Sequence, residues 1–134
     1  MKIFQNNIQS VNTSNHLLNI AIQKHQPQVV ALQEVWQPTD NFSIPGYTLA
    51  SKWYRHENGS EKTVGGGVAI FCQGKAKIVD LIEYKVKDLE ACWCDVMING
   101  ERVVIGSVYI NVGKIKEIDI LESVITKIMK NHKN

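Results

Sequence analysis

Hydrophobic and polar positions in the first part of the chain predict a strand, a loop and a helix. The short segment 2–8 leads into a polar stretch, a pattern typical of a strand that ends in a loop. From His16 the apolar residues recur at helical spacing, with Ser14 or Asn15 placed to cap the helix and Pro27 placed to end it.

The next segments alternate apolar runs with turn residues. Residues 29–32 form a continuous apolar run, which predicts a strand covered on both faces, and Gln33 and Glu34 follow it directly. The segment 44–47, Ile-Pro-Gly-Tyr, is typical of a turn, and a strand from Tyr47 and an exposed loop over 54–63 are expected after it. A carboxylate is thus expected where a buried strand ends.

Four more strands are expected in the second half of the chain, at 68–71, 76–84, 91–98 and 102–110. Asn99 and Gly100 separate the last two strands and are a strong signal for a two-residue hairpin. Apolar residues from Ile115 to Met129 then recur at helical period, with lysines toward the favourable C-terminal end. This order of mostly antiparallel strands and two helices indicates an α/β or α+β layered fold.

The length and composition of the chain indicate one domain or a piece of one. The chain has 134 residues, 44% of them hydrophobic, which suffices for one core. The net charge of +2 is small, so any attraction for phosphate must be local. Three cysteines without a C-x-x-C spacing indicate neither a disulfide framework nor a zinc site, and they fit buried hydrophobes in a reducing compartment. No signal peptide or membrane span is visible, so an intracellular protein, nuclear or cytoplasmic, that is not secreted is expected.

Two polar residues stand at the ends of predicted apolar strands. Asn7 is an amide and Glu34 is a carboxylate, and a layered sheet commonly places ligand-contacting groups at such positions. Strand-end residues of these types are more often caps or surface residues, so the spacing by itself is weak evidence.

Four segments taken in order are more specific: Ile-Phe-Gln-Asn-Asn-Ile at 3–8, Val-Ala-Leu-Gln-Glu at 30–34, Ile-Pro-Gly-Tyr at 44–47 and Gly-Gly-Gly-Val-Ala-Ile-Phe at 65–71. As an ordered set they resemble the apurinic-type endonuclease domain of non-LTR retrotransposons, within the endonuclease/exonuclease/phosphatase superfamily. The resemblance extends from Lys2 to about Ile110.

This resemblance implies a four-layer, two-sheet α/β sandwich that nicks DNA with Mg²⁺, or with Mn²⁺ in its place, at the mouth between the sheets. Glu34 matches the family's metal-binding glutamate, and its hard oxygen suits Mg²⁺. Asn7 matches the asparagine beside the metal, and Tyr109 matches a tyrosine that can donate to a phosphate oxygen. The alternatives are a surface glutamate, a strand-end cap and a buried tyrosine with a satisfied hydroxyl.

The loop before the glycine run is rich in basic residues. In related nucleases loops at this place approach the DNA backbone, so Lys52, Arg55 and Lys62 are candidate phosphate contacts. An ordinary solvated loop is the alternative. The three glycines at 65–67 are expected to permit a tight turn before the following strand.

The chain departs from the family pattern in two respects. Tyr109 is followed by Ile110-Asn111-Val112 in place of a Pro-Asn turn, so Asn111 receives no role. The family's Gly-Asp-Phe-Asn and Ser-Asp-His segments have no counterpart, and no histidine lies in a comparable motif. Residues 1–134 are therefore expected to be the N-terminal half of such a domain, cut before the Gly-Asp-Phe-Asn segment and inactive as a fragment.

Other functions remain open from the sequence. A non-catalytic remnant that acts as an interaction module is one, and another phosphodiesterase or phosphatase of the superfamily is a second. Half of a sandwich is also expected to leave an apolar sheet face without its partner layer, in strands such as 68–71 and 102–110, and to self-associate through it.

Overall fold

The computed structural model describes residues 1–39, 42–60, 65–111 and 113–132. Apolar runs form its strands, and the two segments with helical spacing form its α-helices. The elements in chain order are β1 (Ile3–Asn7), α1 (Val11–His25), β2 (Val29–Gln33), β3 (Tyr47–Trp53), the 3₁₀ turn η1 (Arg55–Glu57), β4 (Val68–Gln73), β5 (Lys77–Asp80), the 3₁₀ turn η2 (Ile82–Tyr84), β6 (Glu90–Ile98), β7 (Glu101–Tyr109) and α2 (Ile115–Asn131).

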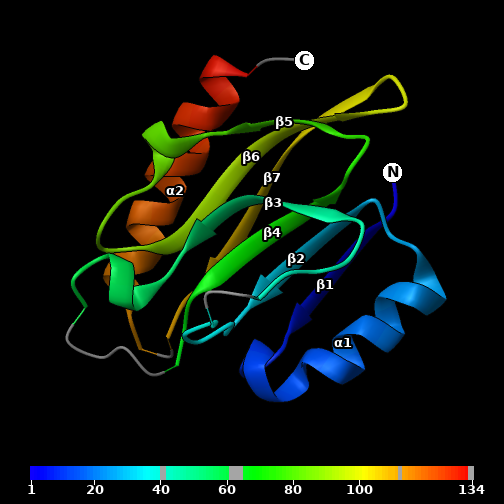
Figure 1. Ribbon diagram of the computed structural model, residues 1–134. Coiled ribbons are helices and arrows are strands. Elements are labelled where there is room, and N and C mark those ends of the chain that lie inside the picture. The colour runs from blue at the N-terminus through cyan, green and yellow to red at the C-terminus, as the bar shows by residue number, and fades with distance from the viewer. Residues whose placement is uncertain (40–41, 61–64, 112, 133–134) are drawn as a thin grey trace.

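The strands form two sheets. In the first sheet the order is β1-β2-β4-β3, with β1 parallel to β2 and the other pairs antiparallel. The second sheet is the antiparallel meander β5-β6-β7. The sheets pack face to face, α1 lies outside the first and α2 lies outside the second (Figure 1). These four layers confirm the predicted fold class.

Alternation along β6 shows how the inner layer is built. Cys92, Cys94 and Val96 point toward the first sheet and pack on residues of β2 and β4, whereas Ala91 and Trp93 point toward α2. All three cysteines are buried and free, and burial raises the pKa of the Cys92 thiol to about 12. The prediction that Cys92 and Cys94 act as buried hydrophobes is confirmed.

The predicted uncovered sheet face is wrong for the central strand β4. Val68 and Ile70 pack against the second sheet, and Ala69 and Phe71 pack in the cluster that includes α1, so both faces of β4 are buried. The reason is that each sheet already carries its own helix and its own partner sheet. Self-association stays a prediction, without this face as its cause.

Two predicted boundaries are corrected by tertiary contacts. Helix α1 begins at Val11 rather than near His16, because Val11 is fully buried and the Ser10 N–H is bound by the Glu34 carbonyl at 2.9 Å. The predicted strand 76–84 ends at Asp80, after which the chain turns into η2. The predicted hairpin is confirmed, with positive φ at both Asn99 and Gly100.

Across the described parts of the chain, neither helix has the length and apolar character needed to cross a membrane.

Candidate active site

The three residues predicted to carry the chemistry lie at one end of the sandwich. Asn7 is the last residue of β1 and pairs with Gln33, which directly precedes Glu34. The Gln33 Nε2 donates a hydrogen bond of 2.8 Å to Oγ of Ser107, two positions before Tyr109 on β7. Asn7, Glu34 and Tyr109 therefore lie at the same end of the two sheets.

The backbone just beyond β1 and β2 has an unusual conformation. Gln9, Ser10, Glu34 and Trp36 all have positive φ, between 51° and 80°, which non-glycine residues rarely adopt. Pairing continues through this region, since the Trp36 N–H donates to the Gly66 carbonyl at 2.9 Å. Such conformations persist only where the surroundings fix them, and they gather at functional sites.

Glu34 and Tyr109 differ in exposure and in bonding. The Glu34 carboxylate is half-buried and has no hydrogen bond or ion pair to any side chain in the described residues, so its oxygens are available to a ligand. The pKa of Tyr109 is raised, first by burial and then by the negative charge of Glu34. The phenol is thus a protonated hydrogen-bond donor at neutral pH.

The residues present fit only part of a Mg²⁺ site. Within the described segments, no three His, Cys, Asp or Glu side chains come together as a metal cluster. One available carboxylate, with the exposed Asn7 amide nearby, fits an ion that retains several waters and needs few protein ligands.

A buried ion pair stands beside these residues. Arg55 Nε and Nη2 contact the two carboxylate oxygens of Glu90 at 2.9 and 3.0 Å, and the two side chains are only 11% and 9% exposed. Glu90 also accepts the Gly67 N–H at 2.8 Å, which connects the two sheets. Its cross-strand neighbour on β7 is Tyr109. The Arg55 guanidinium, predicted to contact DNA, is therefore held by Glu90.

The glycine run is required by this ion pair. A Cβ at Gly66 would lie 2.2 Å from Glu90 Oε1 and 2.4 Å from Arg55 Nε, and its φ is +58°. The predicted tight turn is present, and the close approach of the two charged side chains explains why glycine occupies it.

Lys52 and Lys62 are the other two predicted DNA contacts. Lys52 pairs with Glu57 at 2.9 Å, with both side chains 40% exposed. Lys62 lies outside the described residues. Lys52 is not among the described residues that line the cavity beside Glu90.

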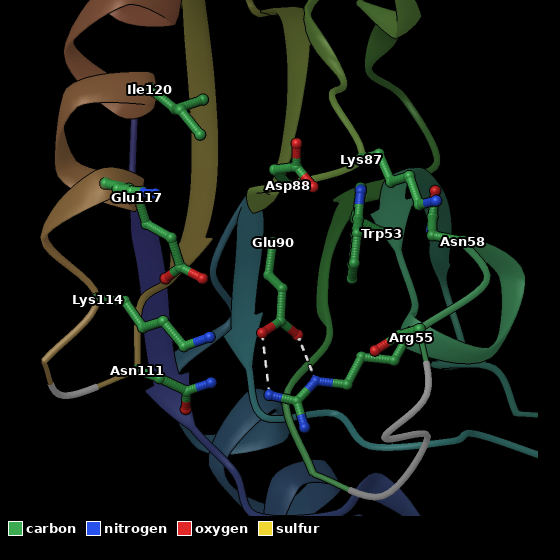
Figure 2. A pocket seen from close by; sticks show the side chains of 12 residues that line it. Trp53, Arg55, Asn58, Lys87, Asp88, Glu90, Asn111, Lys114, Glu117 and Ile120 are labelled. Atoms are coloured by element: carbon green, nitrogen blue, oxygen red, sulfur yellow. Dashed lines mark hydrogen bonds and ion pairs between the residues drawn. The ribbon is translucent and has the colours of Figure 1, made fainter.

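This cavity has a volume of about 590 Å³ and opens next to the Arg55–Glu90 pair (Figure 2). In the described parts of the chain, three separate segments line it: the end of β3 with η1, the residues before β6, and Asn111 with the start of α2. Its lining residues are Trp53, Arg55, Asn58, Ser60, Lys87, Asp88, Glu90, Asn111, Lys114, Lys116, Glu117 and Ile120. Sequence reasoning missed Glu90, Lys87 and Lys114, since none of them belongs to a motif and only the fold brings them together.

Solved structures of known proteins share this architecture. The endonuclease domain of TRAS1, a telomere-specific non-LTR retrotransposon, is 12% identical with a TM-score of 0.71, covering 97% of this chain and 54% of that one. An AP endonuclease from Archaeoglobus fulgidus is 17% identical with a TM-score of 0.64, covering 99% and 52%. The 3′ phosphatase NExo from Neisseria is 19% identical with a TM-score of 0.61, covering 98% and 54%.

Sequence comparison by itself gives no further assignment. No family model matches the chain, and no curated protein matches it. The chain spans about half the length of the solved structures above. At these identities the likeness concerns the fold, and it confirms the resemblance at that level: the chain has the fold of the endonuclease/exonuclease/phosphatase superfamily.

Proposed function

We propose that this chain supplies part of the active site of a Mg²⁺-dependent phosphodiesterase that nicks DNA, as a retrotransposon endonuclease does at its target site. The observation that carries the proposal is that Asn7, Glu34 and Tyr109 lie at one end of a nuclease-type sandwich. The names of the similar structures support DNA as the substrate, and NExo is described as bound to a product DNA hairpin.

Each of the three residues has a chemical role in this proposal. Glu34 would hold Mg²⁺ through its available carboxylate, and the Asn7 amide would orient a water or a carboxylate without adding charge. When bound, the ion would polarise a phosphoryl oxygen and neutralise developing charge. Tyr109 would donate its phenolic proton in a hydrogen bond to a phosphate oxygen, because its raised pKa keeps it neutral.

Metal binding tests the role of Glu34 without requiring activity. Mn²⁺ added to the protein enhances water proton relaxation when it binds, and Glu34→Gln should weaken that binding at least tenfold, about 1.4 kcal/mol. The matched control is Glu83→Gln on η2, an exposed glutamate outside both sheets and 26 positions before Tyr109 in the chain. Equal Mn²⁺ affinity in the wild type and in Glu34→Gln removes Glu34 from the metal site.

Cleavage is tested separately, in a protein extended through the family's Gly-Asp-Phe-Asn and Ser-Asp-His segments, on supercoiled plasmid and on a duplex with an abasic site, each with Mg²⁺. Because residues 1–134 are expected to be inactive as a fragment, nicking is expected only from the extended protein: its parent form and Glu83→Gln should nick DNA, and Glu34→Gln should not. If Glu34 binds Mn²⁺ as expected and neither DNA is cut, the phosphodiesterase proposal fails for this chain. The non-catalytic interaction module is then the better account.

A further inference from the structure

The cavity beside the Arg55–Glu90 pair contains basic side chains that the proposed chemistry does not use. Lys87 stands before β6, whereas Lys114 and Lys116 stand at the start of α2, so they approach the cavity from opposite walls. Figure 2 shows Lys114 directed from the α2 side toward Glu90, with Lys87 on the side of Trp53 and Asn58. In the described residues, none of the three lysines has an ion-pair partner.

The other charged groups in the cavity determine the sign of its net charge. Glu90 is neutralised by Arg55, with which it forms a buried bidentate pair. Among the described lining residues, Asp88 and Glu117 are then the acidic groups beside Lys87, Lys114 and Lys116, which leaves an excess of positive charge. The positive end of the long helix α2 adds to the same field. The cavity therefore favours an anion.

The walls that carry these lysines are fixed before a ligand arrives. The Trp53 Nε1 donates to the Val86 carbonyl at 3.0 Å, which holds the segment directly before Lys87. At the other wall, the Lys114 N–H donates to the Asn111 carbonyl at 3.3 Å and the Glu117 N–H donates to the Lys114 carbonyl at 3.1 Å. A fixed backbone lowers the entropy lost when lysine side chains bind a phosphate.

We propose that this cavity binds a backbone phosphate of the DNA strand, at a position next to the phosphate that Tyr109 contacts. Lys87 and Lys114 supply the positive charge, the exposed Lys116 adds to it, and the Asn111 amide donates a hydrogen bond. The location follows from Glu90, which lines the cavity and pairs across the strands with Tyr109. This inference rests on the proposed function, which identifies the bound phosphate as part of a DNA strand. It adds Lys87 and Lys114 to the candidate phosphate contacts, among which Lys52 and Lys62 stay predictions.

Binding is measured by fluorescence anisotropy with a short labelled duplex in EDTA, so that neither metal nor cleavage contributes. Lys87→Met and Lys114→Met should each weaken binding and lower the slope of log affinity against log salt by about 1. Lys75→Met and Lys77→Met, exposed lysines near the opposite end of β4 and β5, are the matched controls and should leave both quantities unchanged. All four substitutions are at exposed positions, and circular dichroism melts check that each variant stays folded.

Glu117→Gln should change the affinity for the duplex in the opposite direction. Removing this carboxylate from the cavity should strengthen duplex binding, whereas the two lysine substitutions weaken it. Unchanged binding in Lys87→Met, Lys114→Met and Glu117→Gln overturns the inference even if Mg²⁺-dependent nicking is observed. Lysine-dependent binding without any nicking supports this site while the proposed cleavage fails.

A competition experiment identifies the source of the phosphate. Anionic phospholipid vesicles, whose headgroups carry phosphate, are added as the competitor against the labelled duplex. We expect the duplex to bind more tightly than vesicles of equal charge, with the lysine dependence specific to DNA. Vesicles that bind as tightly, and that show the same loss in Lys87→Met and Lys114→Met, overturn the assignment to DNA.

Discussion

Gln33 and Ser107 are 74 positions apart in the sequence and form a buried hydrogen bond of 2.8 Å between the two sheets. The Ser107 hydroxyl also donates to the Leu32 carbonyl at 2.8 Å, so one side chain connects β7 to two successive residues of β2. This pair sets the position of Glu34 relative to Tyr109, because each of those residues follows it closely in the chain.

The first prediction concerns this connection between the sheets. Ser107→Ala removes both bonds and leaves the buried Gln33 amide without its partner, which should lower the free energy of unfolding by about 1–3 kcal/mol. Urea unfolding measures the change. Ser43→Ala, at an exposed position, is the control and should change stability by less than about 0.5 kcal/mol. Equal midpoints for the two variants would show that the bond contributes nothing.

The second prediction compares two glycines with similar backbone angles. Gly66 and Gly59 have φ of +58° and +70°, so alanine is strained at both, but only Gly66 has atoms within reach of a new Cβ. Gly59→Ala should cost about 1–2 kcal/mol from backbone strain. Gly66→Ala should cost about 3–5 kcal/mol, because it also displaces the buried Arg55–Glu90 pair. The same loss in both variants contradicts the role assigned to Gly66.

The third prediction tests the proximity of Glu34 and Tyr109 without any substrate. Tyr109 should titrate above the usual value of 10.0, and Glu34→Gln should bring its pKa down because the neighbouring negative charge is removed. Part of the elevation should persist, since burial is its larger cause. Tyrosine-selective NMR follows the titration, and Glu83→Gln should not move it. A Tyr109 pKa that is unaffected by Glu34→Gln means that the two groups are not near each other.

The fourth prediction concerns stability in acid. Arg102 hydrogen-bonds to Asp95, with Nε 3.0 Å from Oδ1, and holds the pKa of this carboxyl below its usual value of 3.8. The folded state therefore binds the proton less readily than the unfolded state does, so this contribution is complete above pH 3.8 and is lost as the pH falls through the folded-state pKa.

Thermal unfolding between neutral pH and strong acid measures this effect. Asp95→Asn should flatten the acid side of the stability profile, and Asp119→Asn, at an exposed position of α2, should leave the profile as in the wild type. A wild-type profile that does not steepen below pH 3.8 relative to Asp95→Asn contradicts the stabilising role of the pair.

Sequence periodicity by itself determined the order and type of most elements. The continuous apolar run at 29–32 predicted β2, and the Asn99-Gly100 hairpin predicted the pairing of β6 with β7. These predictions succeed because local geometry alone dictates which residues a buried strand or a tight turn accepts. The ordered motifs likewise placed Asn7, Glu34 and Tyr109 at strand ends.

Tertiary structure decided what the local pattern leaves undetermined. Helix α1 begins at Val11 because Val11 packs in the core and the Glu34 carbonyl binds the residue before it. The Arg55–Glu90 pair and the lysines of the cavity come from segments that no local pattern connects. Charged side chains interact through space, so their partners depend on how the two sheets pack and not on distance along the chain.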